Sequence, residues 1–215
     1  MMKLRLFTCL ALLGSLSLSA CSITNVLPEP ADANQIYRLS PQSDATAPYN
    51  GVLQANGLTV RIDRPNAPKA LRGYDLLVSQ DNNRLITIDQ AQWADALPIL
   101  VQRSLISHMD TRADLTGILP TSGARSAYRA HITIRNFEAN FDQGEGNAPK
   151  IIVDYLVTLS HAGSRNLIGT QSFRVENRAS SNRVSDIVRS KSAANYSAMK
   201  DISDWTALSL SQISG

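Results

Sequence analysis

The sequence is poor in cysteine and histidine, the residue types that most often build disulfides and metal sites. Its 215 residues include two cysteines and three histidines. Cys9 falls in the apolar stretch at the start of the chain and Cys21 directly follows that stretch, so the rest of the chain has no pair of thiols. His108, His131 and His161 do not have the spacing of metal ligands. We therefore expect neither a disulfide nor a metal site.

The motifs of common catalytic sites are also missing. The sequence has no Gly-x-Ser-x-Gly, His-Glu-x-x-His or Cys-x-x-Cys motif and no glycine-rich phosphate loop. The acidic pair Asp142 and Glu145 lacks the ligand pattern of a calcium loop. These absences predict a protein that is not an enzyme and uses no cofactor.

The chain carries little excess charge. It has 21 Lys and Arg residues against 18 Asp and Glu. Lys3 and Arg5 precede the apolar stretch, and without them 21 − 2 = 19 basic residues face 18 acidic ones. A nearly balanced chain without a basic block argues against a nucleic-acid partner.

One apolar run stands out, from Leu6 to Leu18, and it is shorter than the ~20 residues that a membrane span needs. It follows Lys3 and Arg5 and ends in small residues, which is the layout of a secretory signal peptide. We predict a leader over residues 1–20.

The end of this leader, Leu18-Ser19-Ala20-Cys21, resembles a bacterial lipobox. The resemblance implies that Cys21 is acylated through its sulfur and that the leader is cut before it. An ordinary signal peptide with a chance cysteine is the alternative. Two or three acyl chains would hold the protein on a membrane without a transmembrane helix. In such lipoproteins Asp after the cysteine favours retention on the inner membrane, so Ser22 points to the outer membrane.

The predicted domain organisation has three parts. After the leader, residues 21–35 contain Pro28 and Pro30 and few apolar residues. We predict that this segment consists of the lipidated cysteine and a flexible tether that could extend up to ~45 Å. Residues 36–215 have the size of a single domain.

Hydrophobic periodicity predicts an α+β fold with a largely antiparallel sheet and two main helices packed on one face. Polar residues 80–83 suggest a hairpin between two of the strands. The first helix should be kinked near Pro98, and Trp93 at its start should be buried. The strands are expected at 36–39, 58–62, 75–79, 84–88, 128–134, 151–160 and 167–175, and the helices near 90–109 and 184–213.

The strand that begins at Tyr128 changes phase. Its apolar residues occupy even positions up to Ile134, whereas Phe137 and Phe141 occupy odd ones. A bulge near residues 135–136 would return both phenylalanines to the core. Without a bulge they would form an apolar patch on the opposite face and become candidates for a partner-binding surface. We favour the bulge, because burying each phenylalanine stabilises the fold by ~1.5–3 kcal/mol.

Taken with the lipobox, these segments make the chain similar to the ABC-type transport auxiliary lipoprotein family, the PqiC/YmbA group. The resemblance is carried by Tyr37-Arg38-Leu39, Val60-Arg61-Ile62-Asp63-Arg64-Pro65, Gln92-Trp93-Ala94-Asp95 with Leu97-Pro98, Gln102-Arg103-Ser104-Leu105 and Tyr196-Ser197-Ala198-Met199.

The resemblance implies a periplasmic lipoprotein that assists an MCE-type ABC lipid transport system. It would be anchored in the outer membrane, with an MCE-domain protein as its partner, and could form a homo-oligomer. Two other classes stay open: a lipoprotein that binds a lipid or small ligand, and a structural lipoprotein of envelope assembly. Co-purification with an MCE protein would distinguish the transport component from these two classes.

Overall fold

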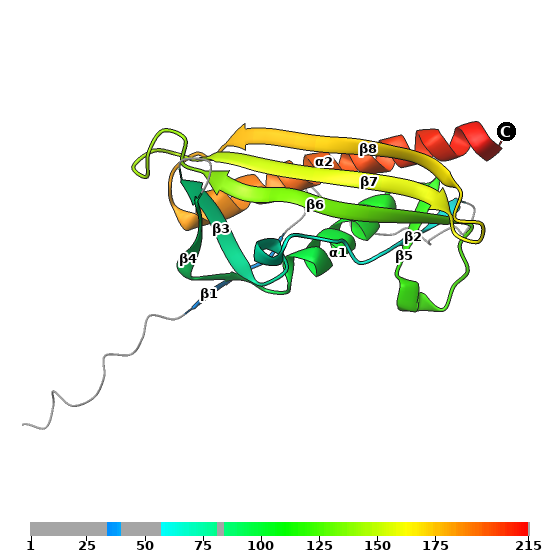
Figure 1. Cartoon of the computed structure of the whole chain (residues 1–215), viewed down its shortest axis with the longest axis horizontal. Coiled ribbons are helices and arrows are strands. Elements are labelled where there is room, and N and C mark those ends of the chain that lie inside the picture. Colours follow the sequence, from blue (N-terminus) through cyan, green and yellow to red (C-terminus); the bar gives the residue numbers. More distant parts are fainter. Residues whose placement is uncertain (1–33, 40–56, 81–83, 215) are drawn as a thin grey trace, which may run out of the picture. The chain divides into compact units, whose positions relative to one another are not determined.

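The computed structural model describes residues 34–39, 57–80 and 84–214. In this part of the chain, one mixed sheet is combined with two α-helices and two short 3-10 helices (Figure 1). The predicted α+β class is confirmed. In chain order the elements are β1 (Gln35–Tyr37), β2 (Leu58–Ile62), η2 (Lys69–Leu71), β3 (Asp75–Gln80), β4 (Arg84–Trp93), α1 (Leu97–Met109), β5 (Leu115–Ile118), η3 (Pro120–Ser122), β6 (Tyr128–Asn140), β7 (Lys150–His161), β8 (Leu167–Arg178) and α2 (Val184–Ser214).

The sheet is built around β6. Along one edge β6 pairs with β7, which in turn pairs with β8, and both ladders are long and antiparallel. Along its other edge β6 pairs with two strands in succession, with β2 near its start and with β3 near its end. The strands β5, β4 and β1 extend the sheet beyond these two.

The expectation of a largely antiparallel sheet is wrong. Of the seven strand pairings among the described residues, four are parallel and three antiparallel. Parallel partners are far apart in sequence, and alternation along a strand does not show which remote strand it joins. The hairpin predicted between residues 75 and 88 is confirmed by the antiparallel pairing of β3 with β4.

The first helix starts later than expected. Residues 90–93 continue β4, and α1 begins at Leu97 with Pro98 in its first turn. Proline is tolerated there because the amide hydrogen it lacks has no partner inside the helix. No kink is needed, and the expected helix start near residue 90 is wrong.

Both helices lie on the same face of the sheet, as predicted (Figure 1). The long helix α2 packs along β7 and β8, and α1 packs against α2 and β5. The other face of β6, β7 and β8 carries mainly polar side chains. The core between the layers includes Val60, Ile62, Leu105, Ile132, Ile134, Tyr155, Met199 and Ile202, each at most 1 % exposed.

The change of phase in β6 is produced by a bulge. Ile134 pairs with Tyr155 and Asn136 with Asp154, so Arg135 is one extra residue on β6. Phe137 is 1 % exposed and Phe141 is partly buried against the core. The predicted bulge is confirmed.

Candidate functional site

The lipobox residues Leu18, Ser19, Ala20 and Cys21 lie outside the described residues. Acylation of Cys21 therefore stays a prediction of the sequence. Within the described residues, the candidate sites are side-chain clusters that bind the helices to the sheet and a charged cluster on the helix-free face.

Phe137 is not part of a surface patch. Its ring packs edge-on against Trp93, with the two centroids 5.9 Å apart. Trp93 is itself 1 % exposed, as predicted. Because the bulge turns both phenylalanines towards the core, the alternative assignment of Phe137 and Phe141 to a partner-binding patch is corrected.

A buried lysine lies next to Phe137. Lys191 of α2 is fully buried, and its Nζ donates to the carbonyl oxygens of Leu77, at 2.7 Å, and Phe137, at 3.5 Å. Burial lowers the pKa of Lys191 to about 7, and the nearby Glu138 opposes the shift. The two carbonyls come from β3 and β6, close to where these strands begin to pair. Lys191 thus supplies a donor where the sheet ladder does not.

The sequence held a signal for this lysine. The buried stripe of α2 includes Ile187, Ala194 and Ala198, and Lys191 falls in the same stripe at helical spacing. A lysine on an apolar stripe indicates either a break in the pattern or a buried ammonium with polar partners. We did not predict this buried lysine from the sequence.

A second buried polar contact ties both helices to the sheet. The Tyr155 hydroxyl of β7 donates to Asn195 Oδ1 of α2 at 2.8 Å, and Asn195 Nδ2 donates to Ser104 Oγ of α1 at 2.7 Å. Burial raises the pKa of Tyr155 well above its ordinary value. The phenol therefore stays protonated and keeps its role as donor.

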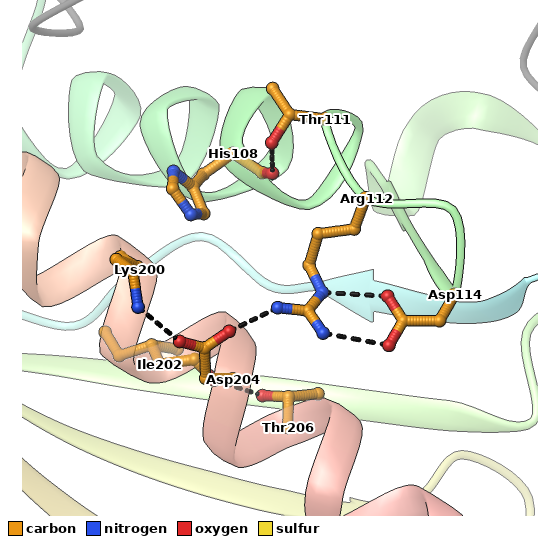
Figure 2. Close-up of polar contacts among 8 residues, drawn as sticks. All are labelled: His108, Thr111, Arg112, Asp114, Lys200, Ile202, Asp204 and Thr206. Carbon is orange, nitrogen blue, oxygen red and sulfur yellow. Dashed lines mark hydrogen bonds and ion pairs between the residues drawn. The ribbon is translucent and has the colours of Figure 1, made fainter.

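Figure 2 shows a charged network between the end of α1 and α2. Arg112 makes two hydrogen bonds of 2.8 Å to the Asp114 carboxylate and also contacts Asp204, which accepts from Lys200 at 2.7 Å. Hydrogen bonds from Arg112 and Lys200 hold the pKa values of Asp114 and Asp204, respectively, below their usual range. Two cations and two carboxylates balance, so the network joins elements and leaves no charge unmatched.

His108 lies beside this network (Figure 2) and packs edge-on against Tyr196, with ring centroids 5.2 Å apart. Burial lowers its pKa, while the charge of Asp204 opposes the shift. The contact between the His108 and Tyr196 rings joins α1 to α2.

The helix-free face carries a different cluster around Asp63, which follows β2. Arg129 Nε donates to this carboxylate, and Arg61 Nε lies 3.6 Å from it. The Nδ1 atom of His131 is 3.8 Å away, and the amide nitrogen of Asn66 is 3.1 Å from the other ring nitrogen of the same histidine. Two arginines share one carboxylate here, so the charges do not balance.

Two further findings concern the described part of the chain as a whole. Within residues 34–39, 57–80 and 84–214, no set of three or more His, Cys, Asp or Glu side chains is arranged to hold a metal ion. Over the same ranges, no helix has the length and apolarity required to cross a membrane.

The fold with its helices on one face of a mixed sheet defines a class already seen in crystals. The chain is similar to the Xanthomonas campestris protein XCC0632 of family DUF330, with 17 % identity, a TM-score of 0.70, and 84 % of this chain and 98 % of that chain covered. It is also similar to an uncharacterised protein of known structure, with 12 % identity, a TM-score of 0.63, and 81 % and 99 % covered. No curated protein matched the sequence.

Residues 37–203 match the family described as the ABC-type transport auxiliary lipoprotein component. The match spans most of the described structure, from β1 into the second half of α2. The chain belongs to this family, as the resemblance in its sequence indicated. Such a component assists a transporter and is not a class of enzyme.

Proposed function

We propose that the protein is an outer-membrane lipoprotein that docks the MCE assembly of an ABC lipid transport system. The observation that carries the proposal is the family match over residues 37–203 together with the lipobox at Leu18–Cys21. The acyl chains on Cys21 hold the protein on the membrane, and residues 21–35 give the domain reach into the periplasm. The domain then receives the end of the MCE assembly that faces the outer membrane.

The anchor supports this proposal energetically. Each buried methylene contributes ~0.8 kcal/mol, so two or three acyl chains suffice for stable attachment. The domain would serve as a binding module, and two of its buried polar groups, Lys191 and Asn195, are engaged in packing the helices on the sheet.

The anchor is tested by Cys21→Ser, in which the hydroxyl cannot replace the acylated thiol. We expect the variant to leave the membrane fraction and to remain folded, because Cys21 precedes the first described strand. Sedimentation of envelopes at high salt checks this, with circular dichroism of the released protein. Cys9→Ser in the leader is the matched control and should stay attached. Membrane retention of the Cys21→Ser variant would contradict the assignment.

The partner is tested by affinity purification from gently solubilised envelopes. An MCE-domain protein should be enriched with the wild-type chain and absent from a mock purification with an unrelated outer-membrane lipoprotein. Recovery of envelope-assembly proteins without any MCE protein would favour a structural lipoprotein instead. Recovery of bound lipid without a protein partner would favour a ligand-binding lipoprotein.

A further inference from the structure

Arg61 and Arg129 face each other across a strand pairing. They are register partners in the parallel pairing of β2 with β6. Val60 and Ile62 beside Arg61 and Ala130 beside Arg129 are buried on the helix side. Like charges directly opposite each other in a sheet destabilise the pairing. Sequences that break such a local rule tend to do so at functional sites.

One carboxylate compensates for this repulsion only in part. Asp63 accepts from Arg129 Nε and lies within ion-pair distance of Arg61 Nε, at 3.6 Å. The Arg61 Nε is buried and makes no hydrogen bond among the described residues. One negative charge therefore faces two positive charges, and one guanidinium is incompletely satisfied.

His131 does not supply the missing negative charge. The amide nitrogen of Asn66 lies 3.1 Å from His131 Nε2, and an amide nitrogen can only donate. This contact places the ring hydrogen on Nδ1, which faces Asp63 at 3.8 Å. The histidine brings no negative charge, so Arg61, Arg129 and Asp63 together leave one positive charge in excess.

The cluster is open to ligands on the helix-free face. The side chains of Arg61 and Arg129 are 34 % and 39 % exposed, whereas that of Asp63 is 13 % exposed. No described residue accepts a hydrogen bond from the terminal nitrogens of either guanidinium. Their outer edges can bind a further anion, and the planar fork of arginine matches a phosphate in two-point contact.

We infer that Arg61 and Arg129 form a binding site for a phosphate group, supplied by a phospholipid headgroup or by free phosphate. Free phosphate presents more acceptor oxygens than a carboxylate would, and a headgroup diester presents two anionic oxygens. Two guanidinium edges offer enough donors for either. Asp63 orients the two arginines through their Nε atoms, and its carboxylate competes with the phosphate for interaction with the guanidinium groups. Phosphate binding at this site does not depend on the MCE partnership.

The test uses the mature lipidated protein in neutral detergent, titrated at constant ionic strength with inorganic phosphate and with glycerophosphoglycerol. Calorimetry measures the affinity. Arg61→Gln and Arg129→Gln should each weaken binding about tenfold or more, the loss expected when a charge-assisted hydrogen bond disappears. Asp63→Asn should strengthen it, because the competing carboxylate is gone.

The Arg189–Asp186 ion pair on α2 provides matched controls, since it joins one exposed arginine to one carboxylate. Arg189→Gln and Asp186→Asn should leave the affinity unchanged. Binding of both ligands identifies a site that accepts a headgroup diester, and binding of inorganic phosphate alone identifies a free-phosphate site. Binding of neither, or equal binding by the wild type and both arginine variants, would overturn the inference. Circular dichroism confirms that each variant is folded.

Discussion

At the residue scale, Lys191 couples the stability of the fold to pH. Folding lowers its pKa from 10.5 to about 7 because the ammonium is desolvated. Between these two values the unfolded chain binds a proton that the folded chain does not. Stability therefore rises with pH across this window and is lowest below pH 7, where both states carry the charge.

Lys191→Met should remove this dependence. Methionine is unbranched and fills a similar space, but it leaves the carbonyls of Leu77 and Phe137 without their donor. We expect a loss of ~1–3 kcal/mol at pH 9 and a smaller loss, or a gain, at pH 6. Urea unfolding of the wild type and the variant at pH 6 and pH 9 measures how the free energy of unfolding of each depends on pH. Lys69→Met, at an exposed position, serves as the control. A variant with the wild-type slope would exclude Lys191 as the group responsible.

Trp93 is the largest fully buried side chain among the described residues. It lies at the end of β4, packs edge-on against Phe137 and is 1 % exposed. Trp93→Ala should cost ~3–5 kcal/mol, a large part of a domain's ~5–15 kcal/mol. Tyr74, which is 52 % exposed nearby in sequence, gives the control Tyr74→Ala, whose effect should stay within ~0.5 kcal/mol. Equal melting temperatures for the two variants would contradict the assignment of Trp93 to the core.

At the element scale, β5 packs closely on α1 at Gly117. A Cβ at Gly117 would lie 3.0 Å from the Ile106 Cα and 3.2 Å from its Cγ1. Glycine is depleted in strands. With Gly117 in this short segment, the sequence did not predict β5 as a strand. The strand forms because its remote partner β2 and the helix above it supply the contacts that local propensity does not.

Gly117→Val should therefore push β5 away from α1. We expect a loss of ~1–3 kcal/mol from overpacking, with faster amide exchange in residues 115–118. Gly163 lies in the β7–β8 turn, where a Cβ would have no described neighbour within 4 Å, so Gly163→Val provides the control. Unchanged exchange in β5 of the Gly117→Val variant would show that the contact with Ile106 does not hold the strand.

At the scale of the whole molecule, local pattern predicted the elements better than their arrangement. Alternation identified β2 and the β6 bulge, a longer apolar run identified β7, and the apolar stripe identified α2. The parallel pairings and the Asp63 cluster depend on strands remote in sequence, such as β2 and β6, so no local pattern could place them. Family membership follows from the chain as a whole, because the match runs over residues 37–203.

The proposed function is that this lipoprotein holds an MCE assembly at the outer membrane. The most direct measurement is the distribution of the MCE protein between inner- and outer-membrane fractions on a sucrose gradient. Wild-type cells should show a portion of it with the outer membrane, and cells with only the Cys21→Ser chain should lose that portion. An MCE distribution that is identical in wild-type, Cys21→Ser and deletion cells would contradict the proposed docking.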